Sequence, residues 1–107
     1  MMKANEEMKV LVFDMDGTLV DLYGVPNWLE DLRNFKARPY QLAKPLYDTE
    51  VLNAVLLALK SCGWRIAVTS WLSKESTVEY DTVVRLAKRE SLERMNFPAD
   101  EIHLVKY

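Results

Sequence analysis

Apolar residues follow two patterns along this chain: short continuous runs, and longer stretches in which they recur at helical spacing. The continuous runs predict three buried strands, at 9–13, 64–69 and 102–105. The helically spaced stretches predict three helices and one further helical turn, at 26–36, 48–61, 77–95 and 40–43. Continuously apolar strands that alternate with helices are typical of a parallel sheet with helices on both faces. The order of elements therefore predicts an α/β fold with three layers, α/β/α.

The helix at 48–61 has the clearest start and stop signals. Asp48 or Thr49 can cap its first turn, and Gly63 can end it. Its apolar residues form a broad face, made up of Val51, Leu52, Val55, Leu56, Leu57, Ala58 and Leu59. A helix with so wide an apolar face is expected to be well buried.

The helix at 77–95 carries a small and apolar stripe that is separate from its basic residues. The stripe consists of Tyr80, Val83, Val84, Ala87 and Ser91. The basic residues of this region are Arg85, Lys88, Arg89 and Arg94. Their spacing favours a solvated basic face, and an anion-binding site is the alternative.

Composition narrows the class of protein without identifying a ligand. Half of the 107 residues are hydrophobic and 28% are charged, which is typical of a single globular domain. The formal net charge of −2 gives no reason to expect a nucleic-acid polymer or an anionic membrane as the partner. No apolar run approaches the ~20 residues that a membrane-spanning helix needs. Cys62 is the only cysteine, which fits a reducing compartment, so we expect a cytoplasmic protein.

Two aspartates follow the first predicted strand. Asp14 and Asp16 can begin on one side of an extended chain, and Gly17 lets the chain turn away sharply. Because neighbouring carboxylates repel each other, the pair predicts a bound cation, a retained proton, or both. Such a site suits attack on a phosphorus centre, and the structural alternative is a pair of aspartates that caps a turn. An EF-hand loop is excluded because Gly17 is fourth rather than sixth and Val25 stands in place of the twelfth-position Glu.

The second predicted strand ends in hydroxyl residues, Thr69 and Ser70. Right-handed crossovers lay such strands side by side in parallel, and ligands then bind beyond their carboxyl ends. Asp14 and Ser70 stand at two neighbouring strand ends, so we expect their side chains to meet at one site.

These residues resemble two motifs of the haloacid dehalogenase-like superfamily of phosphohydrolases. The sequence DMDGTLVD at 14–21 is similar to its first motif, and IAVTS at 66–70 is similar to its second, with Ser70 as the motif hydroxyl. The resemblance implies that Asp14 is a nucleophile that forms an aspartyl-phosphate, and that Asp16 is a general acid and then a base. It implies that Ser70 holds a phosphoryl oxygen. It also implies Mg²⁺, held by the Asp14 carboxylate and by the backbone carbonyl of Asp16.

The resemblance further implies a substrate-binding loop. Backbone N–H groups around Met15, Gly17 and Thr18 would cradle the phosphoryl group, and Trp71 would contact the substrate. The segments 22–29 and 69–74 are also similar, more loosely, to 5′-nucleotidases of the deoxyribonucleotidase kind. The segment at about 20–47 would then be a small helical cap inserted in a Rossmann-like domain that spans 1–107. Tyr23, Trp28 or Trp71 would stack on a base, with core or cap packing as the alternative.

The function that the resemblance implies is a Mg²⁺-dependent phosphohydrolase. Its substrate would be a small phosphate monoester, with nucleoside monophosphates as candidates. The alternatives are a catalytically impaired fragment and a non-catalytic α/β domain that binds phosphate or a protein. Phosphoryl transfer to another acceptor would use the same residues.

Two further elements of the superfamily are harder to place in this sequence. A lysine should offset the charge of nucleophile and phosphate, and it is either Lys106 or absent. No acidic pair follows the third strand to complete a metal site. We therefore expect the chain to be the front part of a longer phosphohydrolase, truncated after its third core strand. The first strand would then have an open edge through which the protein self-associates.

Overall fold

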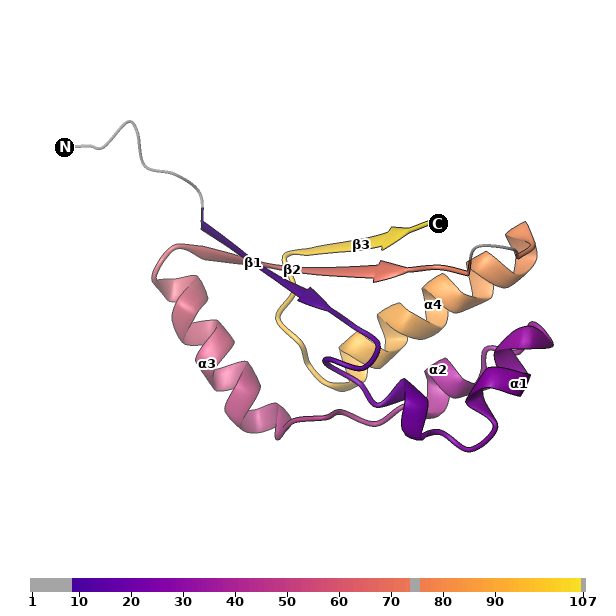
Figure 1. The fold of residues 1–107 in the computed structure, drawn as a ribbon. Coiled ribbons are helices and arrows are strands. Elements are labelled where there is room, and N and C mark those ends of the chain that lie inside the picture. The colour runs from indigo at the N-terminus through magenta and orange to yellow at the C-terminus, as the bar shows by residue number, and fades with distance from the viewer. Residues whose placement is uncertain (1–8, 74–75, 107) are drawn as a thin grey trace.

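Three parallel strands form one open sheet (Figure 1). The computed structural model describes residues 9–73 and 76–106. The strands are β1 (Lys9–Asp14), β2 (Trp64–Trp71) and β3 (Glu101–Val105), in the sheet order β1-β2-β3. The helices are η1 (Leu22–Gly24), α1 (Trp28–Arg33), α2 (Arg38–Leu42), α3 (Thr49–Ser61) and α4 (Val78–Arg94). The predicted α/β class and the parallel sheet are confirmed, and η1 is a short 3₁₀ turn that the sequence pattern did not predict.

The strand register brings the carboxyl ends of the strands to one edge of the sheet. Asp14, the last residue of β1, lies opposite Thr69, and Thr69 lies opposite His103. β2 runs two residues further than the predicted strand and ends at Trp71. Side chains at this edge are therefore close together although they are far apart in the sequence.

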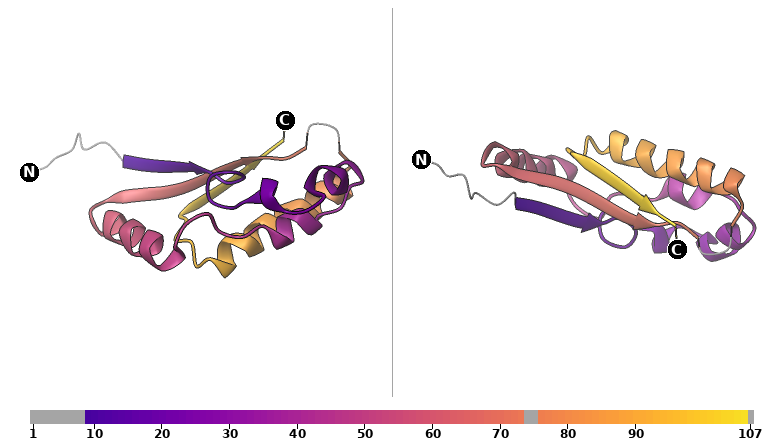
Figure 2. Two further views of the ribbon diagram at one scale, coloured as in Figure 1. Left: turned by 60° about the horizontal axis from the view of Figure 1, so that its bottom comes forward. Right: turned by 90° about the horizontal axis from the view of Figure 1, so that it is seen from above.

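Helices α3 and α4 cover the same face of the sheet (Figures 1 and 2). Successive crossovers of one hand that move in one direction across a sheet place both helices on one side. Leu56 of α3 and Leu92 of α4 accordingly share a core with Ile66 and Val68 of β2. The other face exposes Val10 and Val12, at 41% and 57%. The part of the chain that the structure describes thus has one helical layer, where two were expected.

Helix α3 begins as predicted but is less buried than predicted. The Asp48 side chain caps it by accepting hydrogen bonds from the N–H groups of Glu50 and Val51. Leu56 is fully buried, whereas the expectation of a well-buried helix is wrong for the rest of the apolar face. The exposed apolar side chains of α3 are Val51, Val55 and Leu57. The reason is that only one stripe of α3, which carries Leu52, Leu56 and Leu59, packs against the core, and no described element covers the rest of the apolar face.

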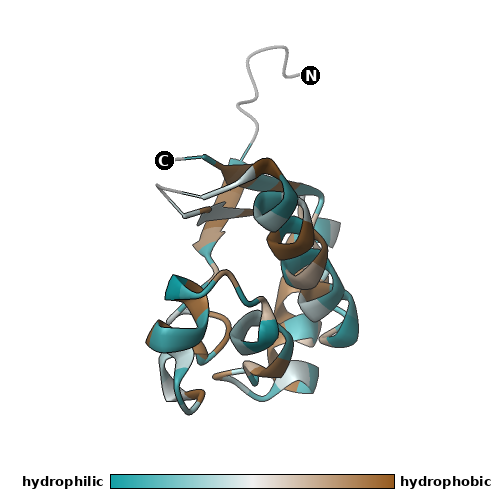
Figure 3. Cartoon of the chain, turned by 90° about the vertical axis from the view of Figure 1, so that its right-hand side faces the viewer, coloured by the Kyte–Doolittle hydropathy of each residue, from teal (hydrophilic) through white to brown (hydrophobic). Residues whose placement is uncertain are grey.

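Helix α4 packs against the sheet and against the segment between β1 and α3. Thr77 caps it by accepting a hydrogen bond from the Tyr80 N–H. Most of the predicted stripe is buried: Tyr80, Val84, Ala87 and Ser91. Val83 is instead about half exposed, and Lys88 is fully buried, so the prediction of a solvated Lys88 is wrong. Hydrophobic and hydrophilic segments alternate along the helices that face the viewer in Figure 3.

The segment between β1 and α3, which we call the cap, carries η1, α1 and α2, and hydrogen bonds join its two ends. The Asp21 N–H donates to the Lys44 carbonyl at 2.8 Å, and the Leu46 N–H donates to the Leu19 carbonyl at 2.9 Å. The cap also rests on α4, because the Tyr80 hydroxyl donates to the Lys36 carbonyl at 2.9 Å. These hydrogen bonds hold the cap against the helix that runs beneath the edge of the sheet where Asp14 lies.

Among residues 9–73 and 76–106, no helix combines the length and the apolar character that a membrane crossing requires.

The outer edge of β1 pairs with no strand in the described part of the chain. Its free N–H and C=O groups can pair with another chain, and the exposed Val10 and Val12 add apolar contact area. We expect the apparent mass in size-exclusion chromatography with light scattering to rise with protein concentration. Val12→Lys should lower that mass, because a charged edge strand resists pairing. A wild-type protein that remains monomeric at every concentration would contradict this expectation.

Candidate active site

A tight loop after β1 positions the two aspartates. The Met15 carbonyl accepts hydrogen bonds from the N–H groups of Leu19 and Val20, at 2.9 and 3.1 Å. Gly17 has a φ of +80°, a left-handed conformation that glycine adopts without strain, and its N–H donates to the Val20 carbonyl at 2.8 Å. The loop therefore turns back at once, which keeps Asp16 beside the end of β1 where Asp14 lies.

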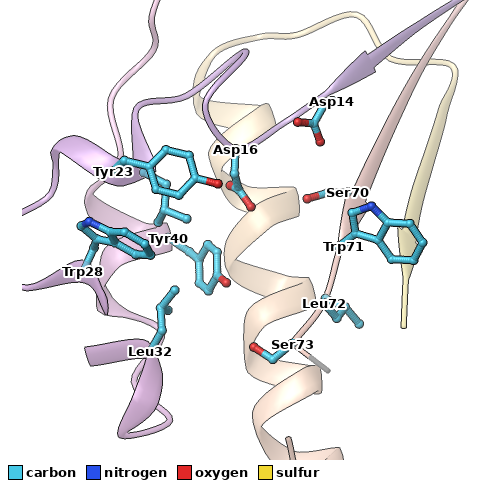
Figure 4. Close-up of a pocket in the computed structure, with 11 residues that line it drawn as sticks. Asp14, Asp16, Tyr23, Trp28, Leu32, Tyr40, Ser70, Trp71, Leu72 and Ser73 are labelled. Carbon is cyan, nitrogen blue, oxygen red and sulfur yellow. The ribbon is translucent and has the colours of Figure 1, made fainter. Parts of the chain in front are cut away.

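A pocket of about 300 Å³ opens at this edge of the sheet (Figure 4). Its sheet side is lined by Asp14, Asp16, Ser70, Trp71, Leu72 and Ser73. Its cap side is lined by Leu22, Tyr23, Trp28, Leu32 and Tyr40. The structure thus brings the predicted residues Asp14, Asp16, Ser70 and Trp71 together, and three aromatic rings of the cap face them.

A buried lysine of α4 binds two of these residues, Asp16 and Ser70. The Lys88 Nζ donates hydrogen bonds to Asp16 Oδ2 at 2.8 Å, to Ser70 Oγ at 2.6 Å and to the Trp71 carbonyl at 3.0 Å. Its side chain is 0% exposed, and all three of its N–H donors have partners. The Tyr40 ring lies over the ammonium group, with 4.8 Å between Nζ and the ring centroid. A lysine is fully buried only when it is paired, and here it is paired with a residue of the site.

Sequence reasoning missed Lys88 although a signal for it exists. Tyr80, Val84 and Lys88 are spaced four residues apart, so they share one face of α4. Leu92 continues the same row and is also buried. Lys88 is the only charged residue among these four, so its position on the buried face of α4 indicates a buried cation. Arg89 is one residue further along the helix, lies on another face and is exposed.

Lys106, the candidate for the lysine that the resemblance implies, binds a residue outside the pocket. Its Nζ donates to Asp81 Oδ2 at 2.6 Å, and Ser76 Oγ donates to the other oxygen of that carboxylate. These hydrogen bonds, the one from Lys106 above all, hold the pKa of Asp81 below its ordinary value. Asp81 therefore stabilises the fold above its ordinary pKa, and this contribution is lost as the pH falls through the lowered pKa.

Tyr23 connects the cap to the loop after β1. A side chain at position 17 would place its Cβ 2.8 Å from Tyr23 Cε2, so the ring lies directly on Gly17. The ring also makes an edge contact with Trp28, with 4.9 Å between the centroids. Burial, and then the charges of Asp16 and Asp14, raise the pKa of the Tyr23 phenol. Burial and Asp16 likewise raise the pKa of Tyr40.

The two carboxylates retain free ligand positions. Within the described residues, the Asp14 carboxylate makes no hydrogen bond or ion pair, and Asp16 Oδ1 is buried without a hydrogen-bond partner. The same residues include no cluster of three or more His, Cys, Asp or Glu side chains suited to a metal. Mg²⁺ needs fewer protein ligands, since one or two carboxylates, a carbonyl, water and phosphate suffice. The donor set of Asp14 and Asp16 therefore fits Mg²⁺.

The other predicted substrate-binding residues do not line the pocket. The Met15 side chain lies in the hydrophobic core. The N–H groups of Gly17 and Thr18 donate to carbonyls within the loop itself, at 2.8 and 3.2 Å. Lys74, at the end of the second similar segment, lies outside the described residues.

The arrangement combines a carboxylate that has no partner among the described residues, a second carboxylate that binds a lysine, and a buried hydroxyl. A carboxylate can attack phosphorus covalently, and a positioned cation and hydroxyl can hold the oxygens of the transferred group. No protein-family model matches the chain, and neither a curated protein nor a solved structure matches it. The function of the chain must therefore be inferred from the geometry of these residues.

Proposed function

We propose that the protein is a phosphohydrolase of the haloacid dehalogenase-like type that acts through an aspartyl-phosphate. The observation that carries the proposal is the fully buried Lys88, which binds Asp16 and Ser70 in a pocket that Asp14 also lines. Burial of a lysine is costly unless its charge is used or paired. A lysine that joins these two residues supplies the positive charge that phosphoryl transfer requires. The parallel sheet with crossover helices supports a Rossmann-like domain.

Each residue has a role that its contacts support. An Asp14 carboxylate oxygen attacks phosphorus, the bond to the ester oxygen breaks, and the leaving alcohol takes a proton from Asp16. A water molecule then attacks the phosphoaspartate, its proton returns to Asp16, and inorganic phosphate leaves. Lys88 binds Asp16 Oδ2, so the proton exchange requires a small rotation of the carboxylate that brings the buried Oδ1 into the pocket.

Ser70 holds the phosphoryl group, and Lys88 positions Ser70 and acts on the group through its charge. Ser70 Oγ accepts a hydrogen bond from Lys88, so its own O–H is directed elsewhere and can donate to a phosphoryl oxygen. The Asp14 carboxylate and the Asp16 carbonyl would hold Mg²⁺. When bound, the ion offsets the repulsion between nucleophile and phosphate.

The size and lining of the pocket favour a small phosphate monoester. About 300 Å³ accommodates a phosphoryl group and a ring, and Trp28 and Trp71 provide aromatic surface for stacking. Nucleoside monophosphates are therefore candidate substrates. The single cysteine of the sequence favours action in the reducing cytoplasm.

The experiment is a phosphate-release assay with p-nitrophenyl phosphate and a set of nucleoside monophosphates. We expect turnover in the presence of Mg²⁺ and its loss after chelation with EDTA, with recovery when Mg²⁺ is restored. If phosphate or vanadate binds without any turnover, the protein is instead a phosphate-binding domain. If neither binding nor turnover occurs, the proposed function is wrong.

A further inference from the structure

The cap residue Tyr23 is held in a defined position at the mouth of the pocket. It lies in η1, the first turn of the cap, and its ring rests on Gly17 and against the edge of Trp28. Tyr23 is 55% exposed, so these two contacts fix the inner side of the ring while the rest remains accessible. The ring is thereby held against the loop that carries Asp16.

The hydroxyl group of Tyr23 is directed into the site. Figure 4 shows its oxygen on the pocket side of the ring, towards Asp16 and across from Asp14 and Ser70. Tyr23 lines the same pocket as these three residues. Among the described residues, no hydrogen-bond partner occupies this hydroxyl. A donor is thus aimed at the space between the two carboxylates and the strand end, where a phosphoryl group would lie.

We propose that Tyr23 is a catalytic residue whose hydroxyl donates a hydrogen bond to a phosphoryl oxygen from the cap side. This inference rests on the proposed function. Ser70 approaches the phosphoryl group from β2, so Tyr23 would bind a different oxygen of the same group. The phenol keeps its proton throughout, and it forms and breaks no covalent bond.

The expected contribution of the hydroxyl is large enough to measure. In phosphoryl transfer, negative charge is spread over three equatorial oxygens, and donors fixed in advance stabilise it. Removal of one such donor typically lowers kcat by roughly 10²–10³-fold. Because Tyr23 is partly exposed to water, we expect a smaller effect, roughly 10–100-fold in kcat/KM.

Tyr23→Phe separates the hydroxyl from the ring. The variant keeps the contacts with Gly17 and Trp28, so its fold and thermal stability should be unchanged. Tyr47→Phe is the matched control, because Tyr47 is equally exposed, at 55%, and does not line the pocket. We expect kcat to fall in Tyr23→Phe, with KM little changed, and wild-type kinetics in Tyr47→Phe.

Orthovanadate provides a readout that does not depend on turnover. It adopts the geometry of the transferring group, and its binding can be followed by the quenching of tryptophan fluorescence. We expect Tyr23→Phe to bind orthovanadate roughly 10-fold or more weakly than Tyr47→Phe. An active wild-type protein whose Tyr23→Phe variant keeps full activity and full vanadate affinity overturns the role of Tyr23 alone. A wild-type protein with neither activity nor vanadate binding overturns the proposed function and this inference with it.

Discussion

Asp14→Asn is expected to lower the rate of phosphate release from a phosphate monoester by roughly 10⁴-fold or more. The amide has the size of the carboxylate, but it lacks the charged oxygen that attacks phosphorus. The Asp14 side chain makes no hydrogen bond or ion pair within the described residues, so the fold should not depend on its charge. The measurement is the initial rate of phosphate release in the presence of Mg²⁺, with stability checked by thermal unfolding.

A trapping experiment shows whether the loss has the predicted cause. Wild-type protein mixed with substrate labelled in its phosphoryl group and quenched with acid should retain label, and Asp14→Asn should retain none. Asp48→Asn is the control, because Asp48 caps α3 outside the pocket and asparagine caps a helix about equally well. Full activity in Asp14→Asn would rule out Asp14 as the nucleophile. Loss of activity in both variants would point to a general effect of the substitution.

The parts of the site that sequence predicts are those set by local structure. Asp14 and Asp16 follow a strand, and Ser70 lies near the end of the next, so parallel pairing alone brings them to one edge. In each case a short apolar run in the sequence predicts the strand, and the strand places the side chain that follows it. The register, in which Asp14 lies opposite Thr69, then brings Asp14 close to Ser70.

The parts that sequence does not predict depend on packing between distant segments. The spacing within α4 shows that Lys88 can be buried, but it does not show that the Tyr40 ring will cover the ammonium group, which depends on where the cap lies. The exposure of Val51 and Val55 on α3 has the same origin, since an apolar face is buried only where another element meets it. The periodicity of a helix shows which residues can be buried, and the tertiary arrangement decides which of them are.

Lys88→Met is expected to abolish activity and also to lower the stability of the fold. The side chains are similar in length, but methionine donates no hydrogen bond to Asp16 or Ser70. The largely buried Asp16 carboxylate would lose its ionic partner, which costs about 3 kcal/mol in the free energy of unfolding. The measurements are urea unfolding, for the stability, and phosphate release, for the activity.

A second substitution separates the two effects. In Lys88→Met/Asp16→Asn the unpaired charge is gone, so most of the lost stability should return, while activity should remain absent because the general acid and the buried cation are both missing. Lys106→Met is the matched control, since Lys106 pairs with Asp81 outside the pocket, and this variant should stay active. If Lys88→Met kept its activity and Lys106→Met lost it, the charge that balances the phosphoryl group would have to come from Lys106. The buried Lys88–Asp16 pair would then contribute to the stability of the fold alone. The double variant tests the stability effect alone, because a recovery of stability shows that the unpaired Asp16 charge destabilises Lys88→Met. The role of the buried cation in the chemistry is tested by the activity of Lys88→Met at a temperature where the variant is still folded, compared with that of Lys106→Met.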